Sequence, residues 1–327
     1  MKIAILKIGA LGDWIMASPL IASVVSSYPQ ATIDCWIGSP FKDAVQYMKG
    51  IRCLAFDPDI FYKHRFWKLP GLIKDIRAQH YDMVFVLDKH WIFGFTAWLC
   101  RIPARIGFDR AGAGWMHTKK VVYGRRMHET AYYLELAKAG GCTRIVKRRS
   151  FSIPAAAVKN AQRIAKKYHL MNACAIAPGG AKNAGQDMPS RRWPVQRFAE
   201  LIQKLPEQVI LLGSKEDKAI TDAFAASSCT NLAGRLSLLE TAALLRKCKG
   251  LITNDAGLMH VAAAVGCPVV AIFGPTDPVR KAPKGARIAW HPMKLDKEEV
   301  FARYSEEAKK NIKKVTVREV LSLWQTI

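Results

Sequence analysis

The stretch from Leu251 to Pro278 constrains the fold most, because its apolar runs and breakers follow the order strand, turn, helix, strand. Leu251–Thr253 and Val269–Phe273 are β-prone runs, and the second is stopped by a Gly-Pro pair. Asn254–Gly257 has turn chemistry, and Leu258–Val265 is an alanine-rich helix closed by glycine, with proline just beyond. Two strands joined in this way by a helix are predicted to lie parallel.

This arrangement predicts an anion site. Parallel strands bring their carboxyl ends to one edge of the sheet, so Asp255 and Thr276 are expected to emerge where open α/β sheets bind ligands. The turn also leads into a helix N-terminus, whose unpaired N–H groups attract phosphate. His260, in the first helical turn, is a candidate phosphate donor. The alternative is structural: Asp255 caps the helix and His260 is a satisfied, half-buried histidine.

The order of strand, breaker and helix recurs through the first half of the chain. Lys2–Ile8 is a predicted strand, and Gly9–Asp13 turns it into a helix that runs towards Ser27. The glycine spacing of this turn is not that of a dinucleotide-binding G-x-G-x-x-G. Three more units are predicted, namely Thr32–Ile37 with Phe41–Lys49, Arg52–Phe56 with Leu69–Gln79, and Met83–Leu87 with Trp91–Arg101. This alternation predicts a parallel sheet covered on both faces.

The second half begins a new alternating series. Phe151–Pro154 is predicted to be an extended linker, and Ala155–Tyr168 a helix that follows it. We therefore place a domain boundary at the linker. The last helix is expected over Thr316–Gln325, where a capping box precedes apolar residues. The predicted strands are Ala173–Ala177, Val209–Leu212, Asn231–Ala233, Leu251–Thr253, Val269–Phe273 and Arg287–Trp290.

The charge balance indicates an acidic partner. Fifty Lys and Arg residues against 26 Asp and Glu residues leave a net charge of +24, which suits nucleic acid, anionic lipid or a phosphorylated substrate. Residues 101–150 hold twelve basic and three acidic residues, with clusters at Lys119-Lys120, Arg125-Arg126 and Lys147–Arg149. Two interpretations stay open, a solvated face or a docking surface for an anionic acceptor or leaflet. Phe61–Lys68 interleaves aromatic and basic residues, as at a headgroup layer or in a loop packed inward.

Cysteine usage and hydropathy indicate a cytosolic protein. The eight cysteines are scattered without a C-x-x-C pair or a cluster with His at metal-ligand spacing, so we expect reduced thiols. Met1–Ile8 is too short an apolar run for a signal peptide. No segment approaches the ~20 apolar residues that span a bilayer, and the nearest, Trp91–Cys100, is expected to be a core helix.

The motif N-D-x-G-x-M-H-x-A from Asn254, followed by P-V-x-x-x-F-G-P-T from Pro268, resembles the signature of glycosyltransferase family 9, the lipopolysaccharide core heptosyltransferases. The resemblance implies the GT-B fold, an α/β architecture of two doubly wound, Rossmann-like domains whose mainly parallel sheets face a central cleft. Residues 1–152 then form the acceptor-binding domain and residues 153–327 the nucleotide-sugar domain. In that fold the last helix commonly packs back on the N-terminal domain.

The implied activity is an inverting, metal-independent glycosyl transfer without a cofactor. The implied donor is ADP-heptose, and the implied acceptor is an anionic glycolipid, Kdo-lipid A or heptosylated core, at the cytoplasmic face of the inner membrane. Nucleic acid is then not expected as a partner. Two alternatives stay open: a GT-B enzyme that uses another nucleotide sugar, as a transferase or epimerase, and a noncatalytic basic protein that binds nucleic acid or membrane.

By the same resemblance, Asp13 matches the catalytic carboxylate that takes the acceptor proton, next to Gly12. A carboxylate beside a helix N-terminus is a weak base, so proton transfer is expected late in the reaction. The competing interpretation of Asp13 is a helix N-cap. The basic residues Lys119, Lys120 and Arg125 are candidates for contacting the acceptor.

The donor site is expected in the second domain. Arg191 stands where the family has a basic residue two positions before Trp-Pro, and its guanidinium suits a diphosphate without metal. Ala256 and Ala181 stand where the family often has hydroxyl residues, which shifts phosphate binding to backbone amides and basic side chains. The candidate donor-binding residues are Gly179, Gly180, Lys182, Arg191, Arg192, Gly213, Glu216, Asp255, Ala256, Gly257, His260 and Thr276.

Overall fold

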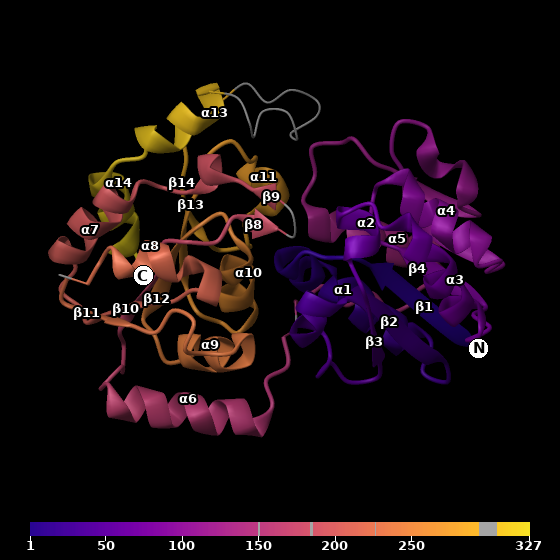
Figure 1. Ribbon diagram of the computed structural model, residues 1–327, viewed down its shortest axis with the longest axis horizontal. Coiled ribbons are helices and arrows are strands. Elements are labelled where there is room, and N and C mark those ends of the chain that lie inside the picture. Colours follow the sequence, from indigo (N-terminus) through magenta and orange to yellow (C-terminus); the bar gives the residue numbers. More distant parts are fainter. Residues whose placement is uncertain (150, 184–185, 226, 294–305) are drawn as a thin grey trace. The chain divides into compact units, whose positions relative to one another are not determined.

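The computed structural model divides the chain into two compact units, Met1–Ser152 and Ile153–Ile327 (Figure 1). It describes residues 1–149, 151–183, 186–225, 227–293 and 306–327. Each unit is built on a six-stranded parallel sheet, which confirms the predicted doubly wound α/β class. The acceptor and donor roles of the two units stay predictions.

The first sheet has the order β3-β2-β1-β4-β5-β6. Its chain order reverses between β1 and β4, so ligands are expected at the carboxyl ends of these two strands. β1 is paired in parallel with β2 and β4, with Ile5 opposite Cys35 and Phe85. The strands are β1 (Lys2–Lys7), β2 (Thr32–Gly38), β3 (Arg52–Phe56), β4 (Met83–Val86), β5 (Ala104–Asp109) and β6 (Lys119–Val122).

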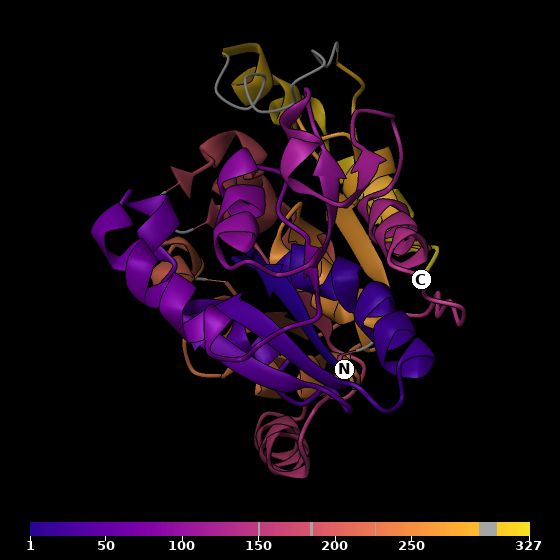
Figure 2. The ribbon, with the colours of Figure 1, turned by 90° about the vertical axis from the view of Figure 1, so that its right-hand side faces the viewer.

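Helices cover both faces of this sheet (Figure 2). Alternate residues of β1 point to opposite faces, so Ile3 and Ile5 pack with α1 and α5, while Ala4 and Leu6 pack with α2, α3 and α4. The helices are α1 (Leu11–Ser27), α2 (Asp59–Tyr62), α3 (Leu69–Arg77), α4 (Trp91–Leu99) and α5 (Glu129–Ala139), with 3-10 turns η1 (Ser39–Ala44), η2 (Phe66–Lys68) and η3 (Ala113–Met116).

The first unit corrects three sequence expectations. The helix expected over Phe41–Lys49 is the 3-10 turn η1, which has proline at its start. The basic segment after residue 101 holds two strands and α5, and Lys119-Lys120 lies on the edge strand β6, where charged side chains prevent further strand pairing. The helix predicted over Trp91–Arg101 exists as α4 (Trp91–Leu99), but it is not the core helix that we expected, because Trp91 and Trp98 are about half exposed, 51% and 44%.

His117 fills the space between α4 and the sheet, and its burial is expected to make the stability of the first unit sensitive to acid. A Cβ on Gly107 of β5 or on Gly94 of α4 would lie 2.2 Å or 3.1 Å from the His117 ring, so both glycines make room for it. Burial, and next the nearby charge of Arg105, lowers the pKa of His117 from 6.5 to about 4. The unfolded chain therefore takes up this proton first as the pH falls.

We expect the free energy of unfolding of the first unit to fall by roughly 2–3 kcal/mol between pH 6.5 and pH 4 because of His117. Urea unfolding at several pH values measures this loss. His117→Gln, which cannot take up the proton, is expected to flatten the dependence over that range. An equally steep pH dependence in His117→Gln and wild type would show that another group is responsible.

The second sheet has the order β11-β10-β7-β12-β13-β14, the same winding as the first. Its order reverses between β7 and β12. The strands are β7 (Cys174–Ala177), β10 (Val209–Leu211), β11 (Cys229–Asn231), β12 (Gly250–Asn254), β13 (Val269–Ile272) and β14 (Arg287–Ala289), with a separate antiparallel pair β8 (Lys182–Asn183) and β9 (Gln186–Asp187). β11 ends at Asn231, where the sequence predicts its start.

Helices also pack on both faces of the second sheet (Figure 1). α6, α9 and α10 share one core cluster with the sheet, and α7 and α14 share the other. The helices are α6 (Ala155–Lys167), α7 (Val195–Lys204), α8 (Lys218–Asp222), α9 (Leu238–Leu245), α10 (Gly257–Ala264), α11 (Pro278–Lys281), α13 (Glu306–Asn311) and α14 (Val317–Trp324), with 3-10 turns η4 (Pro189–Arg191), η5 (Lys215–Asp217) and η6 (Ile312–Lys314).

α14 begins with the predicted capping box, in which the Thr316 hydroxyl accepts a hydrogen bond from Glu319 N and Glu319 accepts one from Thr316 N. Its Trp324 is 2% exposed in the core of the second unit. α14 therefore packs on its own unit, whereas the GT-B resemblance allows the last helix to pack on the first. Among the described residues, no helix is both long and apolar enough to cross a membrane.

Candidate functional site

Asn254 organises the carboxyl edge of the second sheet at its switch point. Its side chain is fully buried at the end of β12, where Oδ1 accepts a hydrogen bond from Trp193 N at 2.9 Å. Its Nδ2 donates to Pro178 O at 2.8 Å, in the loop after β7. The Asn254 amide thus joins the end of β12 to the loop after β7 and to the segment at Trp193. Its role is to hold these segments together.

Asp255 and Arg191 form a buried ion pair beside this amide. Arg191 Nη2 lies 2.8 Å from Asp255 Oδ2, with the two side chains 14% and 2% exposed, and the same nitrogen donates to Asp255 O. Burial raises the pKa of Asp255, but the Arg191 charge, the Thr276 hydroxyl and His260 together hold it below its ordinary value. The geometry therefore brings together four of the predicted donor-site residues in one cluster with a fixed negative charge.

Arg191 has capacity left for a ligand. Its Nε is buried and has no hydrogen-bond partner among the residues that the structure describes. Asp255 binds Nη2 of the guanidinium, so the pair carries no net charge, but the Nε–H group still needs an acceptor. A phosphate oxygen is a partner that would satisfy such a donor with a charge-assisted hydrogen bond.

The N-terminus of α10 is open towards this cluster. The N-cap residue is Ala256, which has extended backbone angles and no side-chain hydrogen bond to the helix. Asp255 therefore does not cap α10, and that structural alternative is wrong. The first turn contains Gly257 and the 4% exposed His260, so backbone N–H groups and an imidazole lie beside Arg191 and Asp255. Such a helix start is a general binding site for phosphate.

Asp217 shapes the glycine loop after β7, a role that sequence reasoning missed. The carboxylate is 6% exposed and accepts hydrogen bonds from Gly180 N at 2.8 Å and from Ser214 N at 2.9 Å. Gly180 N is therefore directed to Asp217, although the sequence suggests it for phosphate. The spacing Ser214-x-x-Asp217 is a capping box and is the signal that could have identified this residue. Glu216, which the sequence analysis places among the donor-binding residues, is exposed on η5.

Gly179→Ala is expected to destabilise the second unit by about 1–3 kcal/mol, because overpacking a tight site forces its neighbours to move. A Cβ at Gly179 would lie 2.3 Å from Asp217 Oδ1. Thermal unfolding measures the effect. The matched control is Gly71→Ala in α3, where a Cβ meets nothing within 4 Å and the change gains helix propensity. Equal melting temperatures for Gly179→Ala and wild type would contradict this account of the loop.

The structure separates the two neighbouring arginines. Arg192 donates from Nε to Gly180 O at 2.9 Å and forms an ion pair with Asp187, so it braces the loop rather than joining the Asp255 cluster. Lys182 lies in β8, but its side chain is outside the part of the chain that is described. Gly213 follows β10, where a Cβ would lie 2.9 Å from Asp217 Cβ, so this glycine makes room for the same carboxylate.

In the first unit, Asp13 lies in the first turn of α1, at the carboxyl end of β1. The N-cap is Ala10, without a side-chain hydrogen bond, so the interpretation of Asp13 as the N-cap is wrong. Gly12 is buried beside it. Burial raises the pKa of Tyr133, and the negative charge of Asp13 raises it further, which places this carboxylate close to the phenol.

A buried ion pair lies at the same edge. Lys7 Nζ is 3.0 Å from Asp88 Oδ1, with the two side chains 3% and 12% exposed, and Asp88 Oδ2 accepts a hydrogen bond from Ile8 N at 2.7 Å. Asp88 follows β4, so it stands across the switch point from Asp13. Asp88 also contributes to the raised pKa of Tyr133, after Asp13 and Glu129. At this edge the half-buried carboxylate of Asp13 therefore lies near Asp88, which is paired with Lys7.

The basic candidates for the acceptor are on the surface of the first unit. Lys119 and Lys120 are exposed on β6, and Lys120 Nζ lies 3.0 Å from Asp109 Oδ2. Arg125 Nη2 lies 2.6 Å from Glu135 Oε2. Their role in binding an acceptor stays a prediction. In the described ranges, no group of three or more His, Cys, Asp and Glu side chains is arranged to hold a metal ion.

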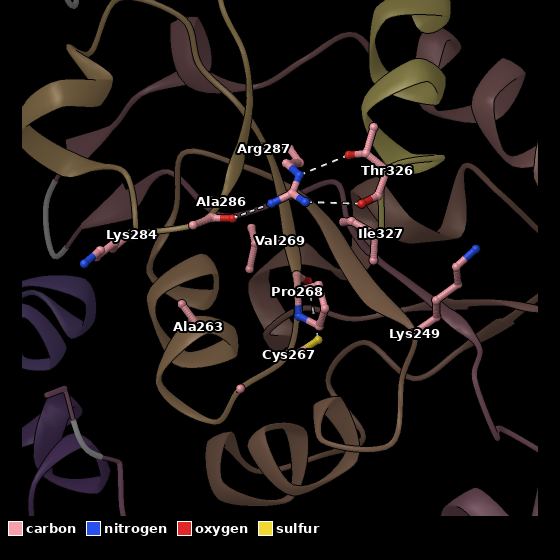
Figure 3. Close-up of a pocket in the computed structure, with 12 residues that line it drawn as sticks. Lys249, Ala263, Cys267, Pro268, Val269, Lys284, Ala286, Arg287, Thr326 and Ile327 are labelled. Carbon is pink, nitrogen blue, oxygen red and sulfur yellow. Dashed lines mark hydrogen bonds between the residues drawn. The ribbon is translucent and has the colours of Figure 1, made fainter.

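A pocket lies at the opposite, amino edge of the second sheet (Figure 3). Two of its cations are held by the fold: Arg287 donates to Thr326 Oγ1 at 3.0 Å and to Gly285 O at 3.0 Å, and Lys249 forms an ion pair with Glu207. Parallel α/β sheets bind ligands at the carboxyl edge, where the Asp255 cluster lies. We therefore assign the candidate site to that cluster.

The chain is similar in sequence and in fold to known proteins. Residues 70–311 match the family model of glycosyltransferase family 9 (heptosyltransferase). Lipopolysaccharide heptosyltransferase 2 of Salmonella typhimurium is 28% identical over 304 residues, which cover 85% of this chain and 84% of the relative. The solved structure of Escherichia coli ADP-heptose lps heptosyltransferase II has a TM-score of 0.74 and 23% identity, covering 100% of this chain and 99% of that one. The structure of E. coli heptosyltransferase WaaC with ADP-2-deoxy-2-fluoro heptose has a TM-score of 0.75 at 17% identity, covering 100% and 99%.

Proposed function

The chain belongs to glycosyltransferase family 9, and on this premise we propose that it transfers a heptose from ADP-heptose to an inner-core lipopolysaccharide acceptor, with inversion and without a metal ion. The observation that carries the proposal is the buried Arg191–Asp255 pair beside the open start of α10. Similar proteins named as lipopolysaccharide heptosyltransferases support the choice of sugar and acceptor class.

The donor diphosphate is proposed to bind between Arg191 and the first turn of α10. Arg191 supplies a permanent positive charge, His260 a ring N–H, and the helix start backbone N–H groups. Negative charge grows on the departing phosphate as the sugar–oxygen bond breaks, so fixed donors at this place stabilise the transition state. Asp255 holds the guanidinium in position, which makes it a positioning residue rather than a contact to the sugar.

Asp13 is proposed to accept the proton of the attacking hydroxyl. The acceptor oxygen forms a bond to the anomeric carbon on the face opposite the diphosphate, the bond to the phosphate oxygen breaks, and the proton moves to the Asp13 carboxylate. This single displacement inverts the anomeric centre. The proton leaves late, once the forming bond has made the hydroxyl acidic enough for a carboxylate to accept it.

The acceptor is proposed to be a phosphorylated glycolipid, Kdo-lipid A or heptosylated core, met at the cytoplasmic face of the inner membrane. The net charge of +24 and the exposed Lys119, Lys120 and Arg125 support an anionic acceptor. Family membership favours a transferase over the noncatalytic alternative. Another nucleotide sugar as donor is the alternative that a donor screen decides.

The stereochemistry and the metal requirement are tested on the reaction product. NMR of the purified product is expected to show an anomeric configuration opposite to that of the donor sugar, and saturating EDTA is expected to leave the rate unchanged. A retained configuration would exclude the single displacement. Loss of turnover in EDTA, restored by a divalent cation, would exclude the metal-independent step. A parallel screen of ADP-, UDP- and GDP-sugars identifies the donor.

A further inference from the structure

α4 is apolar on both its buried and its exposed face. Its sequence, WIFGFTAWL, contains no ionisable residue. Phe93 and Ala97 are 5% and 2% exposed in the core below the sheet. Trp91 and Trp98 are 51% and 44% exposed on the other side of the helix. A helix that is apolar on all sides is normally buried, so its exposed apolar face indicates a role other than folding.

The exposed rings form one continuous surface, which we name the aromatic ridge and define as Trp91, Phe95, Trp98 and Trp115. The ring centroids of Trp91 and Phe95 are 5.9 Å apart, and those of Phe95 and Trp98 are 5.7 Å apart in a stacked arrangement. Trp115 of η3 continues the row at 6.4 Å from Trp98 and is 66% exposed. Single exposed aromatics are common, whereas a contiguous row of this kind marks an interaction surface.

Positive charge lies at both ends of the ridge. Arg101 directly follows α4 and is exposed, and Lys119 lies just beyond η3 on β6. At the start of α4, His90 caps the helix through Nδ1, and its pKa is lowered by burial and then by the nearby charge of Arg110. Two acidic residues near the ridge are paired, Asp109 with Lys120 at 3.0 Å and Asp88 with Lys7 at 3.0 Å. Indole rings flanked by free cations suit an anionic bilayer surface.

The ridge also begins at the edge of the first sheet that carries Asp13. α4 starts three residues after Asp88, which follows β4 at that edge, and His90 and Trp91 have ring centroids 5.7 Å apart. A membrane bound along the ridge would therefore hold a lipid-linked acceptor near the carboxyl edge of the sheet. The position of the ridge beside the Asp13 edge therefore favours a bilayer over a partner protein as its occupant.

We propose that the aromatic ridge inserts into the headgroup layer of an anionic lipid bilayer and fixes the first unit on it. The inference deepens the proposed function, on which it rests for the lipid-linked acceptor. The Trp and Phe rings bury apolar area in the interface, while Arg101, Arg110 and Lys119 contact lipid phosphates. The occupant is the bilayer itself.

Cosedimentation with phosphatidylglycerol–phosphatidylethanolamine vesicles tests the ridge. The triple variant Trp91→Ala, Trp98→Ala, Trp115→Ala is expected to bind at least about tenfold more weakly than wild type, because it loses most of the inserting apolar area. The matched control is Tyr47→Ala, an aromatic residue of the same unit that is 45% exposed and not in the ridge. Its binding is expected to equal that of wild type. Equal binding by the triple variant would overturn the proposal, as would wild-type protein that stays in solution.

Insertion depth provides a second measurement that does not depend on affinity. In a Trp67→Phe background, which removes the other strongly exposed indole, lipids brominated on their acyl chains are expected to quench the tryptophan fluorescence. Changing Trp91, Trp98 and Trp115 to Phe is expected to remove most of this quenching. If sedimentation velocity shows instead a wild-type dimer that the alanine triple variant breaks, with vesicle binding unchanged, the ridge is an interface between two copies and the proposal is wrong.

The proposal and the function can fail separately. Heptose transfer to a deacylated, water-soluble acceptor is expected to be unchanged in the triple variant, because no ridge residue belongs to the transfer site. If wild type binds vesicles through the ridge but transfers no heptose, the ridge proposal stands and the proposed function is refuted. Transfer to the soluble acceptor, with vesicle binding unaffected by the three substitutions, would refute only the ridge.

Discussion

Replacing Asp13 with Asn is expected to lower kcat by roughly a hundredfold to ten-thousandfold, the range that a positioned general base supplies. The amide has the shape of the carboxylate but cannot take the acceptor proton. Asp13 lies in the first turn of α1 but is not its N-cap residue, so the helix keeps its N-cap in the variant. Mass spectrometry of the glycolipid product gives kcat, and titration calorimetry gives the Kd for ADP.

The affinity for ADP is the internal control, because the nucleotide is proposed to bind in the second unit. It is expected to stay within about twofold of wild type if Asp13 acts only on the acceptor proton. Asp75→Asn, a change of the same kind on the exposed surface of α3, is the matched variant and is expected to turn over normally. Unchanged turnover in Asp13→Asn would remove Asp13 from the mechanism.

Replacing Arg191 with Ala is expected to weaken ADP-heptose binding by roughly tenfold to a hundredfold, the value of one or two charge-assisted hydrogen bonds to phosphate. The same change leaves Asp255 buried without its cation. Breaking a buried pair in this way costs about 3–5 kcal/mol of stability, so the variant must be compared at a temperature where it is folded. Calorimetry of donor binding and urea unfolding measure the two effects separately.

A charge-balanced variant separates affinity from stability. Arg191→Met combined with Asp255→Asn removes both charges and is expected to regain most of the stability but none of the donor affinity. Arg192→Ala is the matched control, because that arginine binds Gly180 O and Asp187 instead of the cluster. Donor affinity that is equal in Arg191→Ala and wild type would place the phosphates elsewhere.

The sequence was sufficient for the parallel sheets, because breakers and buried β-branched runs mark each strand of a doubly wound domain. β5 and β6 were the exception in the first unit. Their segment is dominated by charge, and Arg105 on β5 and Lys119 on the edge strand β6 conceal the alternation of apolar residues. An edge strand such as β6 has a neighbouring strand on one side only, so it buries fewer apolar side chains and its apolar signal is weaker than that of a central strand.

The candidate site was predictable as far as local motifs reach. The turn from Asn254 and the basic residue Arg191 could be named from the sequence, yet their contact joins residues 64 positions apart along the chain. For Asp217 the local capping box with Ser214 was a signal, but its contact with Gly180, 37 positions away, could not be read from the sequence. The exposed face of α4 was missed because hydropathy reports which residues are apolar and not which of them the fold covers.

The measurement that tests the account most directly is heptose transfer itself. Wild-type protein, ADP-heptose and purified Kdo-lipid A or heptosylated core are mixed, and the glycolipid and ADP are followed together by mass spectrometry. We predict that one heptose is added to the acceptor for each ADP released. Folded protein that binds the donor yet adds no heptose to either acceptor would contradict the proposed function.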